Sequence, residues 1–189
     1  MSAPRPWIRV IAPEAAEGTL RAVYDETLKK RGRLAAVHMI HSLNPESLRA
    51  HMDLYMTLMF GASPVPRRTR EMVAVAVSRS NGCAYCVAHH ADVLARYEKR
   101  SEYIQAIREG RWEALVPADA VVCRHAEKLT RQPGSMGDGD IAALKSSGLT
   151  DEEILDITQI AAYFNFVNRI VLGLGVDLED ADSRRGFKY

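Results

Sequence analysis

The chain has 189 residues, of which 47% are hydrophobic and 26% are charged, as in an ordinary globular protein and unlike a disordered or low-complexity one. Its 25 Lys and Arg residues balance 24 Asp and Glu residues, so composition gives no sign of a nucleic-acid partner. No apolar run is long enough for a membrane span, and Met1–Arg9 lacks a signal-peptide core. We expect one cytoplasmic domain, 1–189, with a lead-in at about 1–12 and a polar tail at about 180–189.

In chain order, the sequence predicts a series of helices. Pro13 suits a first helical position, and apolar residues then recur at helical spacing until Gly32 ends the run. Asn44 and Pro45 predict the cap and first turn of a Met-rich helix that reaches about Phe60. The helices expected next cover about 67–80, 83–97, 101–110, 117–131 and 138–146.

Two further patterns complete the predicted fold. The stretch 72–77 is β-branched, but no turn residues flank it, so we interpret it as a buried helix and not as a strand. Thr150 and Glu153 have the spacing of a capping box, which predicts a final buried helix through Phe164. The predicted fold class is therefore all-α, a compact multi-helix bundle.

The most informative residues are Cys83, Cys86 and His90 on one expected helix, with Glu71 on the helix before it. At about 100° per residue, Cys86 lies about 60° and His90 about 20° from Cys83 around the axis, which places all three on one stripe. A helix N-terminus and a nearby imidazole favour a thiolate, and a second cysteine can resolve a sulfenic acid as a disulfide. The pattern is typical of thiol redox chemistry. Whether Glu71 reaches His90 depends on the helix crossing angle, which spacing does not give.

Other interpretations of these residues stay open. Cys83 and Cys86 are half of a zinc site if Cys123-Arg124-His125 supplies the rest, although Cys123 also fits a small buried core residue. A thioredoxin fold would need a βαβ pattern, which is absent. His90 also fits a core histidine, and Glu71 a surface residue. No GxGxxG motif lies between a strand and a helix, and we expect no cofactor and no resident metal.

The pattern Glu71-x11-Cys83-x2-Cys86-x3-His90 resembles the signature of the alkylhydroperoxidase D-like family, within the carboxymuconolactone decarboxylase superfamily. The residues from Trp7 to Tyr24 look like the lead-in of its peroxidase-related branch, and residues 161–176 look like its C-terminal segment. The resemblance implies an all-α fold and a homo-oligomer. It also implies that Cys86 is the peroxidatic cysteine, Cys83 the resolving cysteine, His90 the proton relay and Glu71 the ultimate base.

The chain departs from the family pattern at one position. The best-known alkylhydroperoxidase has a histidine immediately before its second cysteine, and here that residue is Tyr85. A phenol forms hydrogen bonds but is a poor base at neutral pH, so Tyr85 is either a hydrogen-bond partner of the substrate or a packing residue. His89 is a partial substitute, although it faces away from the cysteine stripe.

The sequence and the resemblance together predict a cytoplasmic, cofactor-free thiol peroxidase. It would reduce hydrogen peroxide or an alkyl hydroperoxide, with a lipoyl-bearing or thioredoxin-like dithiol as the external reductant. We expect an exposed Cys83 and an acid-shifted pKa at Cys86, the attacking thiol. The alternatives are a lactone decarboxylase-type acid/base enzyme on the same fold and a redox-sensing helical protein that binds a partner.

Overall fold

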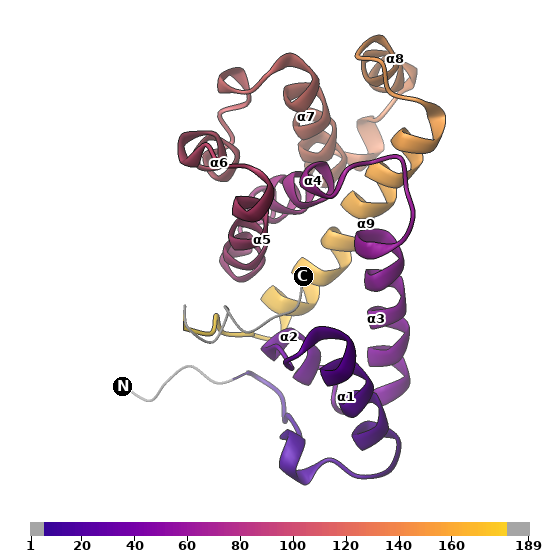
Figure 1. Ribbon diagram of the computed structural model, residues 1–189, viewed down its shortest axis with the longest axis vertical. Coiled ribbons are helices and arrows are strands. Elements are labelled where there is room, and N and C mark those ends of the chain that lie inside the picture. Colours follow the sequence, from indigo (N-terminus) through magenta and orange to yellow (C-terminus); the bar gives the residue numbers. More distant parts are fainter. Residues whose placement is uncertain (1–5, 181–189) are drawn as a thin grey trace. The chain divides into compact units, whose positions relative to one another are not determined.

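The computed structural model describes residues 6–180 and is helical over most of that range (Figure 1). Short 3₁₀ turns cover Pro13–Ala15, Trp112–Ala114 and Pro133–Ser135. The α-helices are α1 (Gly18–Arg31), α2 (Ala36–Met39), α3 (Pro45–Phe60), α4 (Arg67–Ser80), α5 (Ala84–Tyr97), α6 (Ser101–Glu109), α7 (Pro117–Arg131), α8 (Asp138–Ser146) and α9 (Asp151–Gly173). Residues 6–180 contain no strand, so the predicted all-α class is confirmed. Almost all of the predicted tail at 180–189 lies outside the described residues.

The predicted helix starts are largely confirmed by their caps. The Ser47 N–H donates to Asn44 Oδ1 at 3.1 Å, ahead of α3. Thr150 and Glu153 form the expected capping box, with the Glu153 N–H donating to Thr150 Oγ1 at 3.2 Å and the Thr150 N–H to Glu153 Oε2 at 2.8 Å. Within residues 6–180, no helix is both long and apolar enough to cross a bilayer.

Pro13 stands at the first position of a helical turn, as expected, but the continuous helix predicted from there to Gly32 is interrupted. Pro13 starts only a 3₁₀ turn, because Ala16 and Glu17 have extended backbone angles that separate this turn from α1. The end of α1 is as predicted: Gly32 has a φ of 77° and its N–H donates to the Leu28 carbonyl at 2.7 Å.

Thr57–Asn168 form one compact unit, and the described residues on either side of that range form another. In the flanking unit, the Trp7 N–H donates to the Leu174 carbonyl at 2.9 Å, and the Tyr24 hydroxyl donates to the Ile11 carbonyl at 2.9 Å. Gly175 has a φ of 64°, and the Trp7 ring occupies the space that a Cβ would take there. That the chain is a single domain remains a prediction.

In the Thr57–Asn168 unit, α5, α6 and α7 all pack against α4 (Figure 1). The stretch from Arg70 to Ser78 on α4 is buried at every position, so the β-branched segment is a core helix, as predicted. A core helix of this kind is a rigid support for any functional side chain that it carries.

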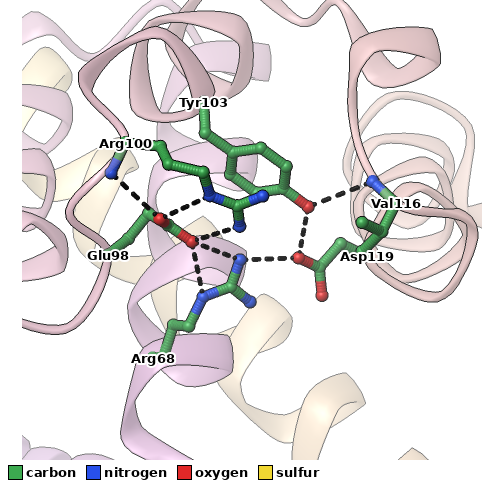
Figure 2. Close-up of polar contacts among 6 residues, drawn as sticks. All are labelled: Arg68, Glu98, Arg100, Tyr103, Val116 and Asp119. Carbon is green, nitrogen blue, oxygen red and sulfur yellow. Dashed lines mark hydrogen bonds and ion pairs between the residues drawn. The ribbon is translucent and has the colours of Figure 1, made fainter.

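A polar cluster joins α4, α6 and α7 to the segment between α5 and α6 (Figure 2). Arg68 binds Glu98 Oε2 at 2.9 Å and Asp119 Oδ2 at 2.7 Å, and the Tyr103 hydroxyl also donates to Asp119. The hydrogen bonds from Arg100 to Glu98 hold the pKa of that carboxyl far below its usual range. The cluster links α4, α6 and α7 through buried and half-buried polar contacts.

Candidate functional site

The turn between α4 and α5 places the two cysteines. The Asn81 N–H donates to the Val77 carbonyl at 3.0 Å, and the Cys83 N–H donates to the Ser78 carbonyl at 2.8 Å. Gly82 has a φ of 70°, a conformation that residues with a Cβ rarely adopt. The Asn81-Gly82 break therefore reverses the chain and presents Cys83 as the residue that precedes α5.

Cys83 occupies the N-cap position of α5, and Cys86 lies one turn further on. The Cys83 sulfur accepts hydrogen bonds from the Cys86 thiol and from the backbone N–H groups of Cys86 and Tyr85. The Cys86 bond and these helix-start donors lower the pKa of Cys83 despite its burial. The pKa of Cys86 is raised, first by its bond to Cys83 and then by burial.

Two expectations about the cysteines need correction. With both thiols reduced, the lowered pKa belongs to Cys83 and not to Cys86. The reason is that the N-terminal amides of α5 and the Cys86 thiol all donate hydrogen bonds to the Cys83 sulfur. The expected exposure of Cys83 is also wrong, because its exposed fraction is 0% and that of Cys86 is 2%.

Glu71 and His90 meet across α4 and α5. His90 Nδ1 lies 2.7 Å from Glu71 Oε2, and the Glu71 side chain is fully buried. The second carboxylate oxygen, Oε1, accepts a hydrogen bond from Arg67 Nε at 2.7 Å. Burial alone raises the pKa of Glu71, but His90 and Arg67 together hold it below its ordinary value. An anionic Glu71 fixes the Nδ1–H tautomer of His90, which leaves Nε2 as the ring atom that can accept a proton.

The surroundings of this ion pair keep its geometry. Arg67 also donates from Nη1 to the Met59 carbonyl at 2.9 Å, and its guanidinium lies 3.9 Å from the centre of the Phe60 ring. The His90 ring meets the Phe164 ring edge to face, with 4.5 Å between centroids. Both partners of Glu71 are thus held by contacts of their own. Sequence reasoning missed Arg67, although its i, i+4 spacing from Glu71 was a usable signal.

Two buried polar residues, Asn168 and Ser78, also act on Cys86. Asn168 and Ser78 both donate hydrogen bonds to the Cys86 sulfur, and both have an exposed fraction of 0%. These bonds act to lower the pKa of Cys86, against the larger effect of Cys83. Sequence reasoning did not place Asn168 at the site. Its signal was a polar residue, with Asn165 one turn before it, inside an otherwise apolar helix.

The structure also locates the secondary residues. The rings of Tyr85 and His89 are in contact at a centroid distance of 4.5 Å, with their planes tilted by 33°, and both residues are buried. Tyr85 contributes its backbone N–H to Cys83. A role for either side chain in turnover remains a prediction.

Cys123 lies on α7, where burial raises the pKa of its thiol well above its ordinary value. Its expected place as a small core residue is confirmed by its exposed fraction of 0%. Between residues 6 and 180, no three side chains of the metal-binding types are gathered closely enough to hold a metal ion.

Residues 45–128, which include α4 and α5, match the carboxymuconolactone decarboxylase family. The structure is similar to that of an uncharacterized peroxidase-related protein of Ralstonia eutropha JMP134, described as an alkylhydroperoxidase AhpD core. That likeness has a TM-score of 0.84, 27% identity and 95% coverage of both chains. A peroxidase-related protein of Silicibacter sp. TM1040 has a TM-score of 0.83, 25% identity and 97% coverage of both chains.

The debrominase Bmp8, solved as a cysteine-to-alanine variant in complex with 2,3,4-tribromopyrrole, has a TM-score of 0.75 at 17% identity. The match covers 96% of this chain and 97% of the debrominase. At this identity, the likeness shows a shared fold alone.

Proposed function

Residues 45–128 are a carboxymuconolactone decarboxylase family domain, and from that premise we propose that the protein is a thiol-dependent peroxidase. Its substrate would be hydrogen peroxide or an alkyl hydroperoxide, and its working compartment a reducing cytoplasm. The observation that carries the proposal is the thiol pair of Cys83 and Cys86 at the start of α5, the helix on which His90 contacts the buried Glu71. The similarity to two peroxidase-related proteins supports it.

In the first step, the Cys86 thiolate attacks one peroxide oxygen. An S–O bond forms, the O–O bond breaks, and the alkoxide or hydroxide that leaves takes up the proton that Cys86 has given up. Cys83 is the nearest group to receive the Cys86 proton, because the two sulfurs already share a hydrogen bond. His90 Nε2 is the next acceptor, and Glu71 stabilises the imidazolium that results.

In the second step, the Cys83 thiolate attacks the Cys86 sulfenic acid. The S–S bond forms, the S–O bond breaks, and the hydroxide leaves as water with the proton of Cys83, so one peroxide has oxidised two thiols. A lipoyl-bearing or thioredoxin-like dithiol then reduces the disulfide by exchange. Because both cysteines are buried, this exchange requires the first turn of α5 to open. A homo-oligomer remains part of the proposal.

Peroxide consumption with dihydrolipoamide, measured on single-cysteine variants, tests the function. Cys86→Ser and Cys83→Ser should each abolish turnover, while the control Cys123→Ala should keep it, because Cys123 lies outside the pair. Turnover of a lactone that survives loss of both Cys83 and Cys86 would instead identify an acid/base enzyme that uses His90 and Glu71. If oxidation changes partner binding and no substrate turns over, the chain is a redox sensor.

The debrominase of similar fold defines one more arm of the experiment. With dihydrolipoamide as reductant, 2,3,4-tribromopyrrole should not compete with peroxide for the thiol pair. Rapid debromination beside negligible peroxide reduction would overturn the proposed substrate class while keeping the two cysteines as the reactive groups.

A further inference from the structure

The geometry points to Asn168 as a further catalytic residue, one that donates a hydrogen bond to the Cys86 sulfur and is held in that orientation by Asn81 and Asn165. Asn168 lies on α9, and Cys86 lies on α5. The role of Asn168 in turnover rests on the proposed function, whereas the hydrogen bonds of Asn168 do not depend on it.

The orientation of the amides is fixed from the far end of the network. Asn165 Nδ2 donates to the Ala161 carbonyl at 3.0 Å, and a carbonyl only accepts. The same Nδ2 lies 3.0 Å from Thr130 Oγ1, whose own proton is donated to the Ala126 carbonyl. Both contacts require the amide nitrogen of Asn165 at this position, so its Oδ1 faces the other way.

The amide orientation of Asn165 determines that of Asn81, which in turn determines that of Asn168. Asn81 Nδ2 donates to Asn165 Oδ1 at 3.0 Å and to Asn168 Oδ1 at 2.9 Å. Since Oδ1 of Asn168 is the acceptor in this contact, its Nδ2 must face Ser78 and Cys86. A flipped Asn168 would set two amide nitrogens against each other in a buried place.

At the end of the network, two protons converge on one sulfur. Asn168 Nδ2 donates to Ser78 Oγ at 3.1 Å, and hydrogen bonds from both of these side chains act to lower the pKa of Cys86. Neither Asn168 nor Ser78 is exposed to solvent. Two buried donors stabilise negative charge on Cys86 when it attacks and again when it leaves during reduction of the disulfide.

The experiment uses a protein in which Cys86 is the only thiol, made by Cys83→Ser and Cys123→Ala. Its thiolate is titrated by ultraviolet absorbance and by the pH dependence of iodoacetamide alkylation. The other titratable groups of the site, Glu71 and His90, stay in place. In this background, Asn168→Ala should raise the titration midpoint by roughly one unit or more, which is about tenfold less thiolate at a fixed pH below the midpoint.

Three further variants separate a donor role from a structural one. Ser78→Ala should also raise the midpoint. Because it is a smaller change, it still tests the inference if the Asn168→Ala protein does not fold. Asn81→Ala should raise it less, because it only frees the Asn168 amide to turn. The matched control Tyr103→Phe removes a buried hydrogen bond from the cluster of Figure 2, and it should lower stability without moving the midpoint.

An unchanged midpoint in folded Asn168→Ala and Ser78→Ala proteins would overturn the inference, as would an equal shift in Tyr103→Phe. The titration needs no peroxide, so its outcome is separate from that of the proposed function. A shifted midpoint in a protein without peroxide turnover rejects the peroxidase alone. Peroxide turnover with an unshifted midpoint rejects the role of Asn168 alone.

Discussion

Glu71 Oε2 and His90 Nδ1 lie 2.7 Å apart, although 19 residues separate them in the chain. The contact exists because the chain reverses at Asn81-Gly82 and sets α5 against α4. It joins two residues that separately fit a core histidine and a surface carboxylate into one hydrogen-bonded pair, with Glu71 fully buried and His90 partly buried. The other oxygen of Glu71 binds Arg67, so the carboxylate bridges the Arg67 guanidinium and the His90 imidazole.

His90→Ala and Glu71→Gln should slow oxidation of the thiol pair and move the pH profile of its rate upward. Each change removes a proton acceptor or its anionic partner, so more of the Cys86 thiolate must form by direct loss of a proton to water. Stopped-flow peroxide kinetics across pH would measure both effects, with circular dichroism as the test of folding. A folded His90→Ala protein with the native rate and pH profile would exclude the relay.

The Arg67–Glu71 pair should dominate local stability. Arg67→Met leaves a buried carboxylate without its cation, and we expect a loss of about 3–5 kcal/mol in the free energy of unfolding. Adding Glu71→Gln to Arg67→Met should restore much of that loss, because no buried charge is then left alone. Urea denaturation of the two single variants and the double variant measures the coupling. Purely additive losses would mean that the two residues do not stabilise each other.

Acid sensitivity follows from the lowered pKa of Glu71. A carboxyl whose pKa falls on folding stabilises the protein above its ordinary pKa of 4.5, and this stability is lost as the pH falls through the lower folded value. Below pH 4.5, the stability of Glu71→Gln should therefore depend less steeply on pH than that of the native protein. Glu46→Gln, at an exposed ion pair, is the control and should keep the native slope. Equal slopes in all three proteins would contradict the assignment.

The helices could be predicted from the sequence because their signals are local. Asn44-Pro45 and the box of Thr150 and Glu153 each identified a helix start from a few neighbouring residues. The contact between Glu71 and His90 depends on how α4 and α5 cross, which no local pattern contains. The hydrogen bond from Asn168 to Cys86 depends in the same way on the packing of α9, a helix that is distant from Cys86 in the sequence.

The state of the two cysteines was the least predictable part of the site. Spacing alone placed Cys83 at the helix start and left it exposed. The surrounding core buries it completely, and the N-terminal amides of α5 lower the pKa of Cys83 instead of that of Cys86.

Mild oxidation should join Cys83 and Cys86 in a reversible intramolecular disulfide. The two sulfurs already share a hydrogen bond, whereas Cys123 is buried on α7 with a raised pKa. Thiol counting should show a loss of two thiols, both in the native protein and in Cys123→Ala. An inter-chain dimer linked through Cys123 would contradict the pairing.

Light scattering should find a homo-oligomer. Large apolar side chains remain exposed on α9, among them Leu155 (56%) and Phe166 (45%), and on α3 at Leu54 (48%). A contiguous apolar patch usually marks an interface, and we expect these side chains to contribute to one. A particle of 21.0 kDa, the mass of one chain, at micromolar concentration would refute the prediction.

The proposed peroxidase depends above all on the roles of its two thiols, with Cys86 attacking the peroxide and Cys83 resolving the product. Mass spectrometry of each single-cysteine variant after one equivalent of peroxide decides between these roles and their reverse. We predict an added oxygen on Cys86 in the Cys83→Ser protein, where the donors Asn168 and Ser78 remain and the opposing charge of Cys83 is gone. We predict no such adduct on Cys83 in the Cys86→Ser protein. An oxygen on Cys83 in Cys86→Ser, with none on Cys86 in Cys83→Ser, would contradict the assignment and reverse the two roles.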